Sequence, residues 1–395
     1  MWTNYNCDSE QPRRARIDKI RATKKLYANP PVAPQANCVN GSQSAQAEVR
    51  MAKVLVTGGA GFFGGILKNR LLAGGAQVVS VDLVPDNAQH PSLTSIQADI
   101  RDENAMRAIF STHSFNAVFH IAAQLGHGSV SREFLWSSNV DGTRVIAQCA
   151  RDAGVKKLIF TSSNCLWASN MGRPVREDDP PAPADLYGES KLEGERLLQK
   201  FAGSLDVVVL RCPTIIDSGR LGLLAILFEF IRENKTVWVV GSGANRYQFI
   251  YAGDLAQACI QSLDFSGYGT FHVGSDNVPT MRACYQAVTA EAGSSSRVRS
   301  LPKAPTLAAM RLAHILNISP LGPYHYRMIA EDFVFDTTRI RQAMGWRPTV
   351  TNNEMLAVAY RYYAQNREEI LTRENVSAHS KAAKMGVVRL LKWIS

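Results

Sequence analysis

Short apolar runs alternate with helix-length segments along most of the chain beyond residue 51. The first run, Val54 to Val56, is followed by a glycine turn, an amphipathic helix and a second apolar run at 78–81. Further strands are expected at 95–99, 116–123, 156–163 and 206–211, and helices at 102–111, 132–153 and 184–202. Strands that alternate with helices of this length predict βαβ units and an α/β fold with a doubly wound parallel sheet.

Beyond Pro213 the alternation loosens, which predicts a second and smaller unit. Helices are expected at 304–316 and at about 352–371, among short strands. The chain therefore divides into a first domain at 51–212 and a C-terminal α/β substrate-binding lobe at 213–375, parts of which return to the first domain.

The two ends of the chain differ from this body. Residues 1–50 are polar and lack an apolar period, which indicates disorder. Because Met51 stands just before the first strand, this leader is interpreted as a tag or an upstream segment, and its Arg-rich stretch leaves an organelle-targeting peptide open. Residues 376–395 form a basic amphipathic tail. One interpretation is weak contact with a membrane surface, and the other is a solvated or packed helix.

The net charge of +10 is concentrated in these ends. Residues 1–50 hold eight Lys/Arg against four Asp/Glu, and residues 376–395 hold four against none. The body at 51–375 carries only +2, which argues against a nucleic-acid-binding face. The seven cysteines form no C-x-x-C pair, so no metal site is predicted and a reducing, cytoplasmic setting is expected. No apolar run reaches the roughly 18 residues of a membrane span.

The glycine turn after the first strand indicates dinucleotide binding. Gly58, Gly61 and Gly64 lie between strand and helix, where they allow a tight turn, close approach of a pyrophosphate, and helix packing in a Rossmann unit. The second strand ends at Asp82, which can accept hydrogen bonds from the adenosine ribose. This acid would repel a 2′-phosphate, so NAD is favoured over NADP. The alternative is a glycine turn in an α/β fold without a cofactor.

The stretch LYGESK places Tyr187 four residues before Lys191. On a helix the two side chains lie on one face, about one turn apart. A neighbouring ammonium favours phenolate, lowers the tyrosine pKa from about 10 and produces a usable general base. A solvated helix face is the alternative for a pair of this kind.

Further motifs, in order along the chain, resemble the extended short-chain dehydrogenase/reductase family, which includes NAD-dependent sugar-nucleotide epimerases and dehydratases. They cover roughly residues 52–365 and are TGGAGFFG (57–64), Asp82, ADIRD (98–102), HIAA (120–123), NVDGT (139–143), TSS (161–163), YGESK (187–191), RCPTII (211–216), FIYAGDLA (249–256) and MGWRP (344–348). Each motif is weak alone, and their joint occurrence is specific.

The resemblance implies a role for each of these residues. Tyr187 is the catalytic base, Lys191 supports it and contacts the nicotinamide ribose, and Ser163 binds the reacting substrate oxygen. An ordinary strand-end serine is the alternative for Ser163. The implied cofactor-binding residues are Gly58, Gly61, Phe62, Phe63, Gly64, Asp82, Asp99, Ile100, Ala122, Ala123, Thr161, Tyr187, Lys191 and Pro213. The implied substrate-binding residues are Gln124, Ser163, Asn164 and Arg246.

The expected reaction is NAD-dependent epimerisation of a nucleotide-diphosphate sugar, at C4, through a keto intermediate. Family dehydratases carry an Asp-Glu pair after the Ser/Thr, whereas this chain has Asn164 and Cys165, so a dehydratase is disfavoured. The alternatives are an NAD-dependent hydroxysteroid- or lipid-type dehydrogenase and a non-catalytic dinucleotide-binding sensor. Intact Ser163, Tyr187 and Lys191 argue against the sensor.

Arg246 is the expected grip on the substrate diphosphate, because a guanidinium binds a diphosphate in a bidentate manner. A surface arginine is the alternative, with Arg211 and Arg327 as the next candidates for the grip. The resemblance also implies a homodimer formed through the helices near 132–153 and 184–202.

Overall fold

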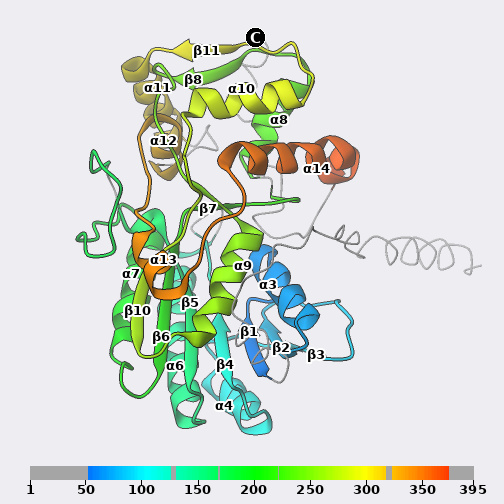
Figure 1. Cartoon of the computed structure of the whole chain (residues 1–395), viewed down its shortest axis with the longest axis vertical. Coiled ribbons are helices and arrows are strands. Elements are labelled where there is room, and N and C mark those ends of the chain that lie inside the picture. The colour runs from blue at the N-terminus through cyan, green and yellow to red at the C-terminus, as the bar shows by residue number, and fades with distance from the viewer. Residues whose placement is uncertain (1–51, 126–129, 168–169, 221, 317–322, 373–395) are drawn as a thin grey trace, which may run out of the picture.

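The computed structural model describes residues 52–125, 130–167, 170–220, 222–316 and 323–372 (Figure 1). The leader at 1–50 and the tail at 376–395 lie outside these residues. Seven parallel strands form the main sheet in the order β10-β6-β5-β4-β1-β2-β3. The strands are β1 (Lys53–Thr57), β2 (Gln77–Asp82), β3 (Leu93–Gln97), β4 (Ala117–His120), β5 (Lys157–Ser163), β6 (Asp206–Cys212) and β10 (Tyr268–His272). The predicted doubly wound parallel sheet is therefore confirmed.

Helices cover both faces of the sheet. Val54 and Val56 of β1 pack into one core with α3 (Phe62–Ala73) and α9 (Ala252–Gln261). Leu55, between them, points to the other core, which contains α4 (Glu103–Thr112), α6 (Gly142–Asp152) and α7 (Leu186–Gln199). This alternation is the period of two expected of a strand that is buried on both faces.

The strand order reverses between β1 and β4. From β1 the chain adds β2 and β3 on one side, and it then returns to place β4 on the other side of β1. In open α/β sheets, ligands bind beyond the carboxyl ends of the strands at this reversal. The glycine turn follows β1, so it lies at this position.

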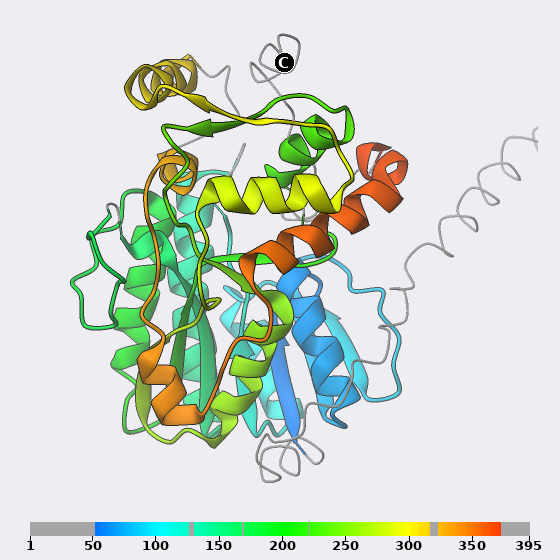
Figure 2. The ribbon, with the colours of Figure 1, turned by 45° about the horizontal axis from the view of Figure 1, so that its top comes forward.

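A smaller lobe lies beyond the carboxyl edge of the sheet (Figures 1 and 2). It contains two parallel strand pairs, β7 (Thr214–Ile216) with β9 (Phe249–Tyr251), and β8 (Val237–Val240) with β11 (Val298–Leu301). Its helices are α8 (Leu224–Arg232), α10 (Met281–Glu291), α11 (Lys303–Ile315), α12 (Pro323–Ala330) and α14 (Asn352–Thr372), while α13 (Thr338–Met344) lies beside β10. The boundary expected at 212/213 stays a prediction.

Two elements differ from the sequence prediction. The helix expected at 132–153 consists of α5 (Arg132–Trp136), a π-helical turn at Ser137–Asp141, and α6. The strand expected at 116–123 ends at His120, because Ala122 and Gln124 direct their N–H groups to side chains instead of to a neighbouring strand.

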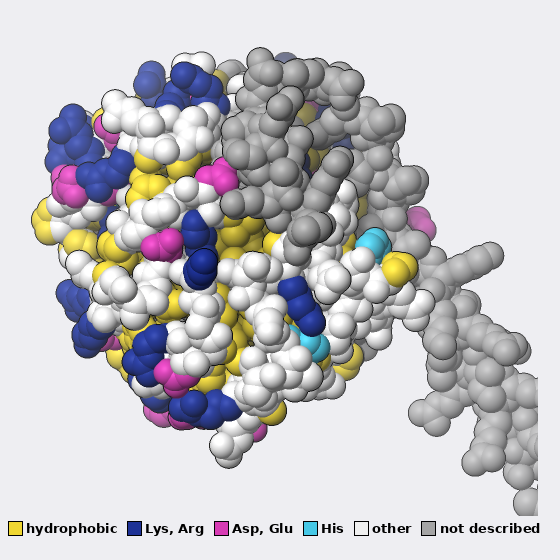
Figure 3. Space-filling view, turned by 60° about the horizontal axis from the view of Figure 1, so that its bottom comes forward, with side chains coloured by type: hydrophobic (Ala, Val, Ile, Leu, Met, Phe, Trp, Pro, Cys, Tyr) yellow, Lys and Arg dark blue, Asp and Glu magenta, His cyan; other side chains and the backbone are white. Residues whose placement is uncertain are grey.

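Charges on the surface are mixed. On the face that Figure 3 shows, Lys and Arg side chains are interspersed with Asp and Glu. None of the described helices is long and apolar enough to cross a membrane.

Asp254 of α9 is hydrogen-bonded to the segment that precedes α14. Its carboxylate accepts hydrogen bonds from Thr349 N at 2.9 Å, Thr349 Oγ1 at 2.6 Å and Val350 N at 3.3 Å. Its carbonyl accepts one from Trp346 Nε1 at 3.0 Å. Burial raises the pKa of Asp254, and these donors oppose that shift. The FIYAGDLA and MGWRP motifs therefore meet at this carboxylate.

We expect Asp254→Ala to lower the free energy of unfolding by about 2–4 kcal/mol, because three donors lose their buried acceptor. Asp152→Ala is the control, since Asp152 forms only exposed ion pairs that contribute little. Urea denaturation measures both. Equal effects of the two substitutions would contradict the role given to Asp254.

Candidate active site

The glycine turn brings the ends of β1 and β4 into contact. Gly58 has a φ of +76°, in the left-handed region that favours glycine. A Cβ there would lie 2.8 Å from the backbone N and Cα of Ala122, in the loop after β4. Any other residue at this position would therefore both strain the turn and push the two loops apart.

The N-terminus of α3 is open to an anion. Gly61 precedes Phe62 and Phe63, and no side chain caps the helix and no acid lies in its first turn. The backbone N–H groups of a helix N-terminus without a side-chain cap can bind a phosphate. Gly64 cannot carry a Cβ, because that atom would collide with the Gly58 carbonyl. The third glycine thus packs the helix against the turn itself. Phe63 is buried in the core, so its backbone alone faces the turn.

Asp82 lies at the rim of the same turn. Its carboxylate accepts hydrogen bonds from Ala60 N at 3.0 Å and Val84 N at 3.2 Å. Four residues later, Asp86 forms a buried ion pair with Lys68 of α3 and accepts a hydrogen bond from Ser80 Oγ at 3.1 Å. This ion pair fixes the loop after β2 against α3.

Asp99 and Ile100, which the resemblance predicts to contact the cofactor, lie in the loop after β3. The Arg101 guanidinium hydrogen-bonds Asp99 at 2.6–3.0 Å and holds the pKa of that carboxyl below its usual value. Ile100 is buried against Gly142, where a Cβ would lie 2.7 Å from Ile Cδ1. The resemblance places adenine here.

A buried relay of hydrogen bonds links the ends of β1 and β4 to the π-helical turn. His120 Nδ1 lies 2.8 Å from Thr57 Oγ1, and His120 Nε2 lies 2.9 Å from Thr143 Oγ1. Burial lowers the pKa of His120 to about 3, with Lys191 adding to the shift, so the imidazole is neutral at physiological pH. Thr143 donates its own hydrogen to the Asn139 carbonyl at 2.7 Å. The direction of the relay follows: Nε2 donates to Thr143, and Thr57 donates to Nδ1.

Asn139 extends this relay to α7. Its amide nitrogen donates to the Gln124 carbonyl and to Ser190 Oγ, both at 2.9 Å, and its oxygen accepts from Gln124 N at 2.6 Å. Ser190 in turn donates to the Tyr187 carbonyl at 2.8 Å. The π-helical turn gives Asn139 this position, and such turns occur frequently at functional sites.

Helix α7 packs along β5. Tyr187 and Lys191 lie in the first turns of α7, and these turns are beside the carboxyl end of β5. Asp185 caps the helix by accepting from Gly188 N at 2.8 Å. A Cβ on Gly188 would collide with the Cys165 carbonyl, two residues after Ser163. Lys191 Nζ lies 3.9 Å from the centroid of the Phe160 ring, further down β5. The glycine in YGESK thus allows the first helical turn to approach Ser163.

The Lys191 ammonium is held in an unfavourable place for a charge. Lys191 is only 2% exposed and forms no ion pair with any described residue. Burial lowers its pKa to about 8, although the neighbouring Cys212 and Glu195 oppose the shift. A buried cation of this kind favours an anion beside it.

Ser163 is the last residue of β5, and its hydroxyl forms hydrogen bonds with the two residues that follow it. Its Oγ accepts from Cys165 N at 3.1 Å and donates a long hydrogen bond to Asn164 Oδ1 at 3.5 Å. Asn164, 4% exposed, donates to Tyr247 OH at 2.7 Å. Thr161 and Pro213 are buried nearby on β5 and after β6, whereas Ala123 is exposed on the loop after β4. The structure thus gathers the predicted residues at one edge of the sheet, with Arg246 on the lobe.

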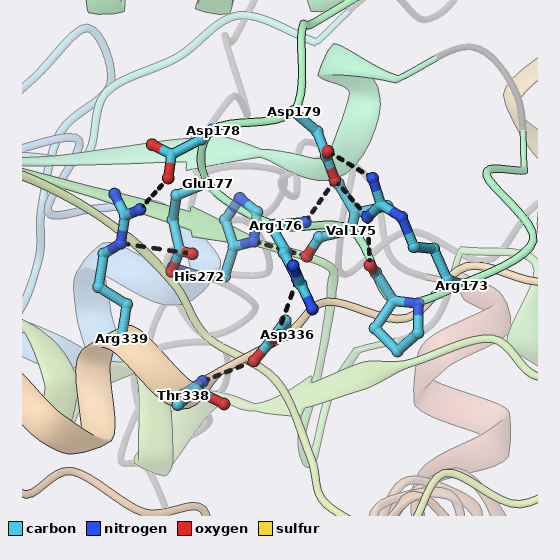
Figure 4. Close-up of polar contacts among 11 residues, drawn as sticks. Arg173, Val175, Arg176, Glu177, Asp178, Asp179, His272, Asp336, Thr338 and Arg339 are labelled. Atoms are coloured by element: carbon cyan, nitrogen blue, oxygen red, sulfur yellow. Dashed lines mark hydrogen bonds and ion pairs between the residues drawn. The ribbon is translucent and has the colours of Figure 1, made fainter.

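The segment before α7 is pinned at several points. Residues 173–179, here called the strap, contact His272 of β10 and also Asp336 and Arg339 (Figure 4). Val175 pairs with the 334–336 backbone at 2.8 Å, and Glu177 accepts from His272 N at 2.9 Å. His272 donates from Nδ1 to the Val175 carbonyl at 3.1 Å. The strap therefore fixes the chain that leads into the Tyr187 helix.

One candidate for the diphosphate grip is excluded by the structure. Arg211 is buried in a bidentate pair with Glu195, with N–O distances of 2.7–3.1 Å, so it is not free to bind a phosphate. The two line a cavity of about 500 Å³ beside β10, away from Tyr187. Arg246 is exposed, and its backbone is held by Asp332 and Phe333. The side chain of Arg327 lies outside the described residues.

No group of three or more His, Cys, Asp or Glu within the described ranges could hold a metal ion. What the site offers instead is an open helix N-terminus for phosphates, a carboxylate at the rim for a ribose, and Ser163, Tyr187 and Lys191 for proton transfer.

This combination of sheet and site defines a class of enzyme. The sequence profile of the NAD dependent epimerase/dehydratase family matches residues 54–274. The chain belongs to this family, and NAD is its cofactor. The glycine turn, the uncapped α3 N-terminus and Asp82 fit that dinucleotide.

Comparison with individual proteins agrees with this assignment. The chain is 35% identical to the uncharacterized protein y4nG of Sinorhizobium fredii, over 86% of this chain and 85% of that protein. It is 28% identical to a UDP-glucose 4-epimerase of Mycolicibacterium smegmatis, over 79% of this chain and 98% of that enzyme. The crystal structure of the Thermotoga maritima UDP-glucose 4-epimerase with UDP-glucose shares the fold, with a TM-score of 0.65 and 23% identity over 80% of this chain and 99% of that one.

Sequence reasoning missed the residues that position the site. His120, Asn139 and Thr143 lie inside motifs that the sequence displays, yet no local pattern shows that they bond to one another. The pairing of Lys68 with Asp86 was also not predicted.

We expect Gly188→Ala to lower kcat at least tenfold and to destabilise the fold, because the added Cβ must displace α7 from the Cys165 carbonyl. Gly194→Ala is the matched control on the same helix, where the Cβ would lie 3.2 Å from the tip of the Phe160 ring and 3.7 Å, an ordinary contact distance, from the Asn139 carbonyl. Turnover and thermal unfolding measure both. If Gly188→Ala turns over like Gly194→Ala, the close approach does not set the geometry of the site.

We expect Lys191→Met to stabilise the cofactor-free protein at pH 7 while abolishing turnover. A folded-state pKa of about 8, against 10.5 for the free side chain, corresponds to roughly 3 kcal/mol of destabilisation while the group is charged in both states. As the pH rises from about 8 toward 10.5, the folded state releases the proton first, so the wild type regains stability and the difference closes. Lys200→Met, exposed beyond α7, is the control. A difference in unfolding free energy that does not change with pH would refute the assignment.

Proposed function

We propose that the protein epimerises a UDP-sugar at C4, with NAD retained through the cycle. The observation that carries this proposal is the convergence of Ser163, Tyr187 and Lys191 at the carboxyl end of β5, beside the glycine turn. Similar proteins include a UDP-glucose 4-epimerase and a UDP-glucuronate 4-epimerase, the latter from Thermodesulfobacterium geofontis at 30% identity over 58% of this chain and 77% of that enzyme.

Each residue has a defined part in the proton transfer. Tyr187, as phenolate, takes the proton of the C4 hydroxyl, and Lys191 stabilises that phenolate. Ser163, whose Oγ accepts from Cys165 N and donates only a long bond of 3.5 Å to Asn164 Oδ1, turns its hydrogen to the same oxygen. NAD, held by the glycine turn and the N-terminus of α3, would supply reversible hydride transfer at C4. Tyr187 then gives the proton back to the C4 oxygen.

The residues after Ser163 support an epimerase over a dehydratase. A dehydratase needs a further acid and base beside the sugar. Asn164 cannot titrate, and its amide is already bonded to Tyr247. The Asp-Glu pair of the family's dehydratases is therefore missing here.

The proposal includes a homodimer through α5, α6 and α7 in a cytoplasmic setting. Trp136, at the end of α5, is 37% exposed, which is unusual for a tryptophan and suits an interface. Arg246 remains the proposed grip on the diphosphate, and Asp82 the residue that favours NAD over NADP.

We expect the wild type to interconvert a UDP-sugar and its C4 epimer without net NADH release, and Tyr187→Phe to retain NAD but lose 10²- to 10⁴-fold in rate. Proton NMR follows the epimers, and absorbance of the reduced nicotinamide follows redox release.

Stoichiometric accumulation of NADH would identify a dehydrogenase instead. Loss of water from the sugar would identify a dehydratase. NAD binding with no reaction on UDP-, dTDP-, GDP- or CDP-sugars would favour a sensor.

A further inference from the structure

Helix α11 exposes an apolar stripe at the end of the lobe. None of its residues is buried. Leu312, Ile315 and Leu316 are 58%, 75% and 58% exposed, and they are three of the six exposed large apolar side chains in the described part of the chain. Spacings of three and four residues place them on one side of the helix. The opposite side faces α12, where Tyr326 OH donates to the Met310 carbonyl at 3.0 Å.

The segment of sequence that carries this stripe holds cations and no acids. Residues 292–330 contain five Lys/Arg and no Asp or Glu. Four of these cations, Arg297, Arg299, Lys303 and Arg311, are described and exposed. None of them takes part in an ion pair among the described residues. Elsewhere on the surface, exposed arginines such as Arg107 and Arg361 are paired with acids.

We propose that this surface, formed by α11 and β11 and here called the lobe tip, docks on an anionic lipid bilayer. A bilayer interface offers apolar depth to Leu312, Ile315 and Leu316 and negative headgroups to the surrounding cations. An exposed helix with an apolar stripe and basic flanks is the usual form of an interfacial anchor.

The positive charge of the chain's own terminal segments argues against their packing on the lobe tip. The tail at 376–395 holds four Lys/Arg and no acid, and the leader at 1–50 is also net basic. Packing either segment on the lobe tip would bring like charges together. The same holds for the lobe tip of a second copy. The basic tail instead adds to the attraction for the same anionic surface.

The placement of the lobe tip leaves the site accessible. Helix α11 and β11 lie at the end of the lobe that is remote from the main sheet (Figures 1 and 2). The glycine turn and the Tyr187 helix lie on the opposite side of the lobe, so docking through the tip does not cover them.

The test is vesicle co-sedimentation of the full chain at low ionic strength. The wild type should bind vesicles of phosphatidylcholine with about 30% phosphatidylglycerol and not vesicles of phosphatidylcholine alone. Binding should weaken as salt rises.

Two variants separate the apolar and electrostatic contributions. The triple variant Leu312→Gln, Ile315→Gln, Leu316→Gln should lose at least tenfold in partition coefficient. The variant Arg297→Gln, Arg299→Gln, Lys303→Gln, Arg311→Gln should lose about fivefold for each cation that reaches the headgroups. Leu83→Gln with Val84→Gln removes comparably exposed apolar area from the other domain, and it should bind vesicles like the wild type.

Several outcomes would overturn the proposal. Equal binding to neutral and anionic vesicles would remove the electrostatic basis. Unchanged binding of both lobe-tip variants, with loss on neutralising Lys381, Lys384, Arg389 and Lys392, would assign membrane contact to the tail alone. A change of oligomeric state in the lobe-tip variants, without any lipid binding by the wild type, would identify a second copy as the partner.

Discussion

The relay through His120 is the interaction on which the rest of the site depends. It joins Thr57 at the end of β1 to Thr143 and, through Asn139, to Ser190 in α7. Every side chain of the relay is buried, where water cannot serve as a substitute partner. Loss of one of these side chains therefore leaves the polar group of its neighbour without a hydrogen bond. The relay therefore couples the glycine turn after β1 to the helix that carries Tyr187. His120 is neutral, which lets one nitrogen donate while the other accepts, and an imidazolium would reverse the direction of the bond to Thr57.

Catalytic geometry and stability oppose each other at Lys191. Phe160 and the surrounding core desolvate the ammonium, and the described residues place no acid in contact with it. The protein thus keeps a destabilising charge that is useful only when an anion lies nearby. Such a cost is expected where residues are selected for chemistry instead of packing. The buried pair of Arg211 and Glu195 shows the contrast, because there a cation and an anion satisfy each other and are removed from the chemistry.

The sheet and the convergence of motifs were predictable because each rests on local periodicity. Buried parallel strands are apolar throughout, helices have a period near four residues, and glycine turns mark where the two meet. Tyr187 and Lys191 share a face by helical geometry alone. The π-helical turn was not predictable in this way, because the contact that it allows between Asn139 and Gln124 joins two separate segments of the chain. Arg211 shows the same limit of sequence reasoning. It was a further candidate for the diphosphate grip, and only the folded chain shows that its guanidinium is bonded to Glu195.

The cations of the described chain fall into two groups, those in an ion pair with an acid and those without one. Many cations of the body form ion pairs with acids, and the body at 51–375 carries a net charge of only +2. The segment at 292–330 departs from this pattern, and its apolar side chains are exposed where its cations are unpaired. Either feature alone would be ordinary on a protein surface. Helix α11 leaves apolar side chains exposed to water, and the described cations of the same segment have no acid partner within the described part of the chain. An interface that supplies both apolar volume and anions lowers the free energy of both groups. This is the physical basis for proposing that the lobe tip docks on a membrane surface.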